Sequence, residues 1–312
     1  MSRVYDIVGK VGDEQAFRQE IRDWLAEKIP AGWRARWQGV REEELKAEIV
    51  AWLEERRKVG LATPHWPREW GGPGLPFAYQ IMVYEEFARA DAPELDMYTI
   101  SLFHTPATLF EHGTQEQKDK YLSGITQGTD IWCQGFSEPG AGSDLAALRT
   151  SARREGDHYV VNGQKIWSSS SMHARYCLLL ARTDPNGTRK HDGISYFIMD
   201  MHSPGVEVRP IPQITGESEF AEIFLDDVKI PVANLIGAEG NGWNIAQSTL
   251  STERGLLIFG AVERLAHSFG LDGREAKDTW MRDVQHRREY AALYAELQSI
   301  RLMIRQVLIE LE

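Results

Sequence analysis

The stretch Trp132-Cys-Gln-Gly-Phe-Ser-Glu-Pro-Gly-Ala-Gly-Ser-Asp144 is followed, after a short span, by Asn162-Gly-Gln-Lys-Ile-Trp-Ser-Ser-Ser170. Gly140, Ala141 and Gly142 have little or no side chain, so the backbone there can approach a flat ligand closely. Both stretches carry short hydroxyls, and free N–H groups in such a loop can face an anion or a ring carbonyl. Asn-Gly between apolar-rich runs predicts a hairpin turn that brings the second stretch, with its tryptophan, back beside the first. Taken separately, each stretch also fits a Gly/Ser turn beside a core tryptophan.

The residues before these stretches follow a helical repeat. Asp13 can cap a helix with apolar positions at helical spacing, and Pro30 ends that helix. A second amphipathic helix is expected to end at Gly60, and Thr114-Gln-Glu-Gln117 predicts a capping box at the start of a later one. We therefore expect a helical domain over residues 1–128.

From Asp130 the period of the sequence changes. Cys133 and Cys177 lie in apolar, strand-like text and are expected to be reduced core residues. Regularly spaced short strands predict an antiparallel barrel or sandwich over residues 129–236. The expected strands are separated by Gly, Pro, Asn and Asp turns and cover residues 148–152, 158–161, 176–181, 195–199, 206–208 and 220–225.

A further helical region is expected over residues 237–312. It opens on Gly237-Ala-Glu-Gly-Asn-Gly242, whose spacing does not match a dinucleotide-binding fingerprint. Glu253 enters a strongly apolar run, and desolvation there would raise its pKa and suit it to act as a base. The alternative is a surface glutamate beside a solvated Arg254. Closer to the end, an apolar stripe at helical spacing must bury against something; it consists of Leu293, Leu297, Ile300, Ile304, Val307, Leu308 and Leu311.

The composition excludes several classes of function. The 312 residues carry 35 Lys and Arg against 46 Asp and Glu, a net charge of −11, which has the wrong sign for binding nucleic acid or an anionic membrane. No apolar stretch approaches ~18 residues and no leader pattern is present, so a cytoplasmic protein without a membrane span is expected. Asp226 and Asp227 would point apart on a strand, so no metal site is expected.

The two stretches together resemble the acyl-CoA dehydrogenase family. Its flavin-binding signature has the form of Ser137-Glu-Pro-Gly-Ala-Gly-Ser-Asp144, and its next strand carries Asn-Gly-x-Lys-x-Trp. The resemblance runs from the N-terminal helices to the end of the chain. It implies an α+β multidomain fold with an N-terminal helical domain, a central antiparallel β-barrel or sandwich, and a C-terminal helical bundle that is incomplete relative to the family.

The resemblance also implies a cofactor and a substrate. FAD would be held by Gln134, Phe136, Ser137, Ser143, Trp167, Ser168 and Ser169. An acyl-CoA thioester would contact Ser143, Phe103, Ser251 and Arg254. His104 is interpreted as a polar residue of the pocket wall rather than as a base.

Glu253 carries the implied chemistry. One branch of the family, including isovaleryl- and long-chain acyl-CoA dehydrogenases, places its catalytic glutamate in text like Glu253-Arg254. The implied reaction is FAD-dependent α,β-dehydrogenation: the glutamate removes the α proton, a hydride passes to flavin N5, and hydrogen bonds to the thioester carbonyl stabilise the enolate-like charge. An electron-transferring flavoprotein is the expected electron acceptor.

Two departures from the family keep alternatives open. The usual Arg-x-x-Phe-Gly motif is absent, with Arg274 or Arg282 as candidate substitutes, and the family's last helices have no counterpart here. These departures favour a homo- or hetero-oligomer, or a non-catalytic partner subunit of a two-chain acyl-CoA dehydrogenase. A flavin monooxygenase or oxidase on the same fold is the other alternative, and Glu253 argues against it.

Overall fold

The computed structural model describes residues 4–37, 40, 42–216, 218–251, 256–268 and 283–310. The chain divides into two compact units. The first consists of Met1–Trp33, Lys58–Glu94 and Thr252–Glu312, and the second of Arg34–Arg57 and Leu95–Ser251. The domain limits expected from the sequence, at residues 128 and 236, stay a prediction.

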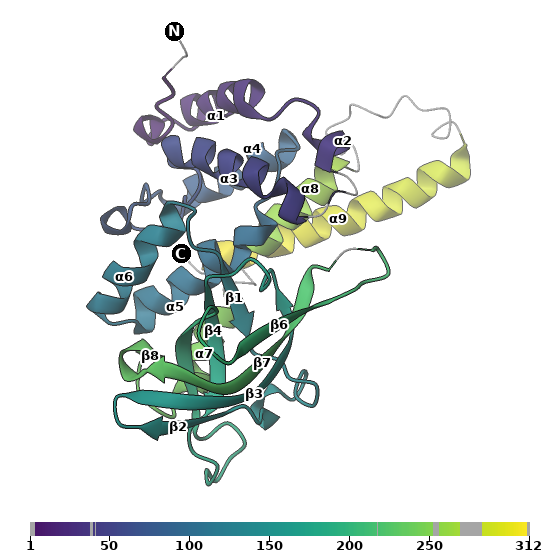
Figure 1. The fold of residues 1–312 in the computed structure, drawn as a ribbon. Helices are drawn as coiled ribbons and strands as arrows, with labels where there is room; N and C mark the ends of the chain where they lie inside the picture. Colours follow the sequence, from purple (N-terminus) through teal and green to yellow (C-terminus); the bar gives the residue numbers. More distant parts are fainter. Residues whose placement is uncertain are drawn as a thin grey trace. The chain divides into compact units, whose positions relative to one another are not determined.

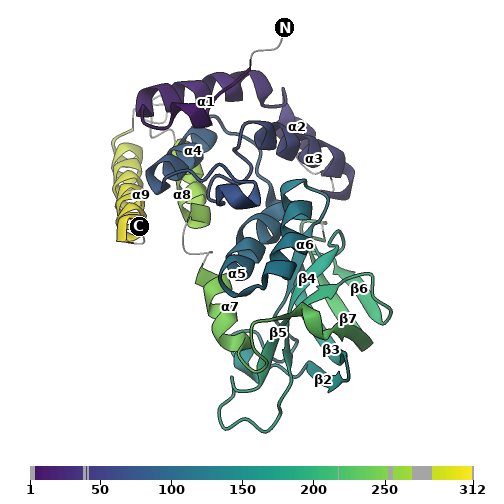
Figure 2. The same cartoon turned by 90° about the vertical axis from the view of Figure 1, so that its left-hand side faces the viewer.

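The first unit is helical. Its helices are α1 (Glu14–Lys28), α4 (Phe77–Arg89), α8 (Leu256–Ser268) and α9 (Val284–Glu310), with short 3-10 turns at Val8–Lys10 and Arg68–Trp70. As predicted, the side chain of Asp13 caps α1 by accepting a hydrogen bond from the Ala16 N–H at 3.0 Å. α4 packs against both α1 and α8, and α8 packs against α9 (Figure 2).

The second unit combines helices with the β-sheet (Figure 1). The helices are α2 (Trp33–Trp37), α3 (Glu42–Lys58), α5 (Thr105–His112), α6 (Gln115–Thr126) and α7 (Gly242–Ser251). A 3-10 turn (Asp96–Tyr98) and a π-helix (Ile100–His104) lead into α5, and further 3-10 turns cover Leu145–Ala147 and Val232–Asn234. The predicted capping box is present at the start of α6, between Thr114 and Gln117.

The sheet agrees with the expected antiparallel barrel or sandwich. Its strands are β1 (Trp132–Gly135), β2 (Ser151–Glu155), β3 (His158–Ser169), β4 (Tyr176–Arg182), β5 (Ile194–Asp200), β6 (Val206–Ile211), β7 (Phe220–Pro231) and β8 (Leu235–Ile236). They are ordered β6-β7-β3-β2-β4-β5-β8, with β1 beside β4. β2 and β4 are joined by one pairing, Ser151 with Arg182. β1 contacts β3 and β5 contacts β7, although these strands are not neighbours in the sheet, so two layers face each other. The rings of Tyr159 on β3 and Phe197 on β5, for example, lie 4.9 Å apart. Most pairings are antiparallel, but β1 and β2 both pair with β4 in the parallel direction.

The hairpin turn predicted at Asn162-Gly163 is wrong. The chain turns between β2 and β3, where Glu155 pairs with His158, and residues 162 and 163 lie inside β3 at a shift of register against β7. Glycine is needed there for space rather than for a turn, because an added Cβ would lie 2.7 Å from the Cα of Thr150. The strand expected at residues 148–152 accordingly begins later, at Ser151.

No helix in the described ranges is long and apolar enough to cross a membrane.

Candidate functional site

The two stretches singled out in the sequence lie side by side. The backbone N–H of Ile166 on β3 donates to the carbonyl of Ser137 at 2.9 Å. One residue earlier, Lys165 Nζ donates to the carbonyl of Phe136 at 3.0 Å. The predicted adjacency therefore holds, although a different turn produces it.

The loop after β1 turns its carbonyl groups toward the protein. The carbonyls of Phe136 and Ser137 bind β3 as described, and Glu138 and Ala141 exchange two backbone hydrogen bonds of 3.0 Å around Pro139-Gly140. In a trans peptide the C=O and the next N–H point in opposite directions. The Ser137 N–H therefore points away from Lys165, and no described residue accepts a hydrogen bond from it. This loop can offer a donor to a ligand.

Trp167 has an unusual conformation and an open ring. Its φ is 60°, in the left-handed region that costs a non-glycine residue of the order of 1–3 kcal/mol. The side chain is 57% exposed and touches the edge of Phe220, with ring centroids 6.1 Å apart. Trp24, Trp52, Trp66 and Trp132 are by contrast fully buried. A strained backbone that holds a large aromatic ring in solvent is typical of a ligand-binding position.

The hydroxyls beside Trp167 differ in their surroundings. Ser168 is 1% exposed, and its Oγ has no hydrogen-bond partner among the residues placed in the structure. Ser169 and Ser143 are exposed. A buried hydroxyl without a partner costs free energy, and this one is enclosed by protein between the exposed side chains of Trp167 and Ser169.

The glycines of the first loop leave room for such a ligand. A Cβ added at Gly140 or at Gly142 would meet no atom within 4 Å. At Gly135, however, an added Cβ would lie 2.9 Å from Cys177 Sγ, so this glycine serves the packing of β1. The two cysteines lie opposite each other on β1 and β4, buried and free, as predicted.

Gln134 and Phe103 belong to one neighbourhood. Gln134 lies on β1, and its side-chain oxygen is 3.3 Å from Nδ1 of the buried His104 on the π-helix. Half-buried Phe103 precedes His104 on that helix, and Ser101 Oγ accepts a hydrogen bond from the Trp132 N–H at 2.9 Å. The π-helix therefore holds Phe103 beside the strand that carries Gln134.

Phe136 is connected to the end of α7 through buried side chains. Its ring lies 5.6 Å from that of Tyr196, whose hydroxyl is 3.3 Å from Thr249 Oγ1. The Thr249 hydroxyl is also 2.6 Å from that of Thr108 on α5. Ser251, two residues further on, is exposed and donates to the carbonyl of Ser248 within its own helix.

Glu253 and Arg254 lie outside the described residues, as do Arg274, Arg282 and Leu311. Their expected roles stay predictions. Within the described part of the chain, no group of three or more His, Cys, Asp or Glu side chains could hold a metal ion.

A buried ion pair supports the loop, and the sequence reasoning missed it. Lys165 is fully buried and its Nζ lies 2.8 Å from Glu138 Oε1. The carboxylate also accepts hydrogen bonds from the backbone N–H groups of Arg149, at 2.7 Å, and Thr150, at 2.9 Å.

Burial opposes ionisation of Glu138, but the Lys165 ammonium and these donors outweigh it and hold the pKa of Glu138 below its usual value. Burial lowers the pKa of Lys165, and Glu138 offsets part of that effect. Glu138 lies in the first stretch quoted from the sequence and Lys165 in the second, and this placement was the signal that could have indicated the pair.

Comparison with known proteins agrees with this architecture. The model of the acyl-CoA dehydrogenase N-terminal domain matches residues 12–129, and that of the middle domain matches residues 133–228. The acyl-CoA dehydrogenase IpdE1 of Mycobacterium tuberculosis is 43% identical over 252 residues, which cover 80% of this chain and 65% of that protein. The chain thus spans about two-thirds of the length of this relative.

Solved structures give the same result. The Tcur3481–Tcur3483 steroid ACAD aligns with a TM-score of 0.83 and 30% identity over 95% of this chain and 76% of its own. The ChsE4–ChsE5 complex from Mycobacterium tuberculosis aligns with a TM-score of 0.78 and 29% identity over 99% of this chain and 78% of its own. On the two matching domain models and these relatives, the chain belongs to the acyl-CoA dehydrogenase family.

Proposed function

We propose that this chain binds FAD and an acyl-CoA thioester and catalyses α,β-dehydrogenation, with Glu253 as the base. The observation that carries the proposal is the strained and exposed Trp167 on β3, next to the loop whose Ser137 N–H has no acceptor among the described residues. The loop and the strand that carries Trp167 are in direct contact, because the Ile166 N–H donates to the Ser137 carbonyl. A flavin ring has the flat face and the carbonyl and nitrogen edge that such donors suit.

Each predicted cofactor residue has a role in this proposal. Trp167 would cover one face of the ring and limit access of water, and Phe136, 5% exposed, would close the site from the protein side. Ser137, Ser168 and Ser169 would supply hydrogen bonds to the ring. Gln134, on the strand before the loop, would also lie along the edge of the ring. Exposed Ser143, beyond open-sided Gly142, would meet the pyrophosphate and the pantetheine arm.

The reacting groups divide between the chain and the cofactor. Glu253 would accept the α proton of the thioester, and FAD, when bound, would accept the hydride from the β carbon. Phe103 would line the acyl chain beside His104, while Ser251 and Arg254 would flank Glu253. We further propose an electron-transferring flavoprotein as the acceptor of the electrons.

An oligomer would cover the exposed apolar surface of α9. Leu302, Met303 and Ile309 are each more than 60% exposed, and Ile300 and Val307 are nearly half exposed. Ile300, Met303 and Val307 follow helical spacing and share one face of α9, and an exposed apolar face marks an interaction surface. Since the ChsE4–ChsE5 neighbour is a complex of two proteins, we propose that an unlike subunit binds here. Sedimentation as a stable monomer with bound FAD would contradict this.

The test is an anaerobic titration of the FAD-loaded protein with acyl-CoA thioesters. Binding and dehydrogenation would bleach the flavin absorbance, and a steroid-derived thioester belongs in the panel because one structural neighbour is called a steroid ACAD. Glu253→Gln should keep FAD but slow the bleaching at least about 100-fold, since a positioned base contributes that much or more. Exposed Glu111→Gln on α5 is the matched control and should behave as wild type. A yellow protein that no thioester bleaches would favour a non-catalytic partner subunit, and rapid oxygen consumption would favour a monooxygenase or oxidase.

A further inference from the structure

Lys165 and Glu138 are buried charged groups that the proposed reaction does not use. They join the two motifs: Lys165 comes from the middle of β3, and Glu138 from the loop after β1. An exposed surface pair would be worth little, but this lysine is fully enclosed, and the side chain of its partner is only 8% exposed. Neither charge has an evident role in solubility or in surface interactions.

The ammonium makes contacts that an ordinary ion pair does not need. Besides the carboxylate it binds the carbonyl of Phe136 at 3.0 Å, within an irregular segment of backbone. A lysine suits this task because its compact ammonium carries three donors that can reach partners in different directions. The carboxylate in turn anchors the N–H groups of Arg149 and Thr150, just before β2.

The contact with Phe136 sets the orientation of one peptide plane. With the Phe136 carbonyl held inward, the Ser137 N–H of the same trans peptide must face outward. The next carbonyl, that of Ser137, is held by Ile166, immediately before Trp167. The lysine and the backbone of β3 therefore fix the two consecutive peptides that border the proposed cofactor site.

We propose that Lys165, held by Glu138, is a positioning residue that presents the Ser137 N–H to the flavin. The inference rests on the proposed function, because it assigns the presented donor to that cofactor. Without the ammonium, the Phe136–Ser137 peptide can rotate, and a donor that was fixed in advance must be ordered when the ligand binds. Affinity for the flavin falls accordingly.

The test separates positioning from stability with a double variant. Lys165→Met alone leaves a buried carboxylate without its cation, and it can fail to fold. Lys165→Met combined with Glu138→Gln removes both charges, which should restore the thermal unfolding midpoint to near that of wild type. Exposed Lys229→Met on β7 is the matched control.

Two readouts apply to each full-length variant. Equilibrium titration with FAD should give a dissociation constant at least about tenfold higher for the double variant than for wild type and Lys229→Met, with a shifted visible spectrum of the bound flavin. Hydrogen exchange without FAD should be at least about tenfold faster for the peptide covering residues 134–144, with β5 unchanged. A double variant with wild-type affinity and wild-type exchange in the loop would overturn the proposal.

The exchange readout also keeps this proposal distinct from the proposed function. If the wild-type chain binds no FAD, the flavin assignment fails whatever the lysine does. Faster exchange of residues 134–144 in the double variant would then still support loop positioning by Lys165, and unchanged exchange would refute it.

Discussion

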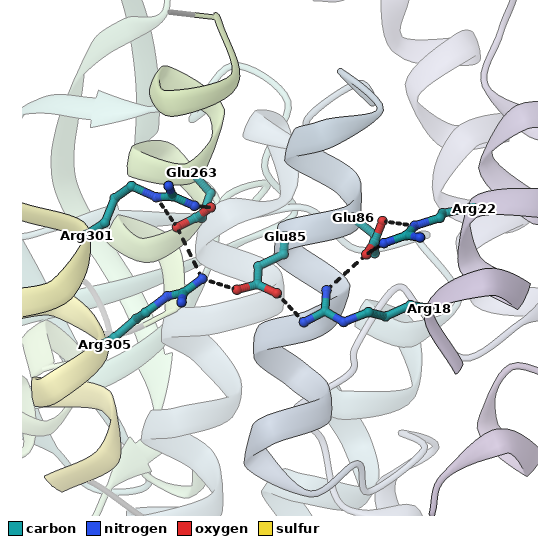
Figure 3. Close-up of polar contacts among 7 residues, drawn as sticks. All are labelled: Arg18, Arg22, Glu85, Glu86, Glu263, Arg301 and Arg305. Atoms are coloured by element: carbon teal, nitrogen blue, oxygen red, sulfur yellow. Dashed lines mark hydrogen bonds and ion pairs between the residues drawn. The ribbon is translucent and has the colours of Figure 1, made fainter. Parts of the chain in front are cut away.

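Buried carboxylates occur in both compact units, but they do different work. In the β-sheet unit, Glu138 and Lys165 bind backbone groups of a loop as well as each other. In the helical unit, three glutamates and four arginines from α1, α4, α8 and α9 bind one another through their side chains (Figure 3). These seven residues, the helical charge cluster, are Arg18, Arg22, Glu85, Glu86, Glu263, Arg301 and Arg305.

The geometry of the helical charge cluster suits the joining of regular elements. Arg301 binds Glu263 through two hydrogen bonds, of 2.8 and 2.6 Å, and Arg22 binds Glu86 through two of 2.7 Å. The planar guanidinium of arginine binds a carboxylate through two parallel hydrogen bonds, whereas the compact ammonium of Lys165 donates to several separate acceptors. The helices satisfy their own backbones, so the cluster stabilises packing, while the loop pair fixes backbone that has no regular structure.

The two regions should differ most in how stability and FAD affinity change when an ion pair in each of them is broken. Glu263 is 1% exposed and Arg301 20%, so Glu263→Gln should lower the free energy of unfolding by about 3 kcal/mol, because an arginine loses its carboxylate in a largely buried place. Chemical denaturation measures this loss. The affinity of the folded variant for FAD should stay within twofold of wild type. A fall in affinity as large as that of the Lys165 variants would remove the distinction between the two regions.

A smaller loss of unfolding free energy is expected in acid, and carboxylates in both regions should contribute to it. Despite the opposing effect of burial, Arg22 and Arg18 hold the pKa of Glu86 below its usual value, as Lys165 does for Glu138. A carboxyl with a lowered folded-state pKa stabilises the fold above its unfolded pKa of about 4.5, and that contribution is lost as the pH falls through the folded pKa. Unfolding free energies of Glu86→Gln and wild type should therefore converge as the pH is lowered from about 6 to about 3. A constant gap between them would contradict the ion-pair assignment.

The smallest effect is expected at an exposed ion pair. Glu48 on α3 accepts hydrogen bonds from Arg36 and Trp37, each 2.8 Å long, but both side chains of its ion pair with Arg36 are more than 40% exposed. Water and salt screen such a pair. Glu48→Gln should leave the thermal unfolding midpoint within the error of repeated scans. A clear drop would show that the exposure of an ion pair does not predict its contribution to stability.

Local rules predicted much of the fold, because the elements concerned are fixed by nearby residues. The Asp13 cap, the box at Thr114 and the change of period near Asp130 all depend on neighbours in sequence. The Asn162-Gly163 turn was wrong because a glycine is required there by the close approach of Thr150, a residue on another segment. The Lys165–Glu138 pair was missed for the same reason, because it depends on a contact that only the folded chain brings together.

The site was predicted in part. Its two stretches were correctly expected to meet, although the Asn162-Gly163 turn from which this was expected was wrong. The strained φ and the 57% exposure of Trp167, and the unpartnered Ser168 hydroxyl, are properties of tertiary structure that no residue pattern contains.

Titration of the purified chain with FAD, with Trp167→Ala in parallel, tests the central claim most directly. Wild type should bind, with quenching of tryptophan fluorescence and of flavin fluorescence. Trp167→Ala should bind about tenfold more weakly, a loss of about 1.4 kcal/mol that matches an aromatic stacking contact. Trp70→Ala, a half-buried tryptophan of the helical unit, should bind as wild type does. Wild-type affinity in Trp167→Ala, or no binding by wild type, would contradict a flavin site beside this ring.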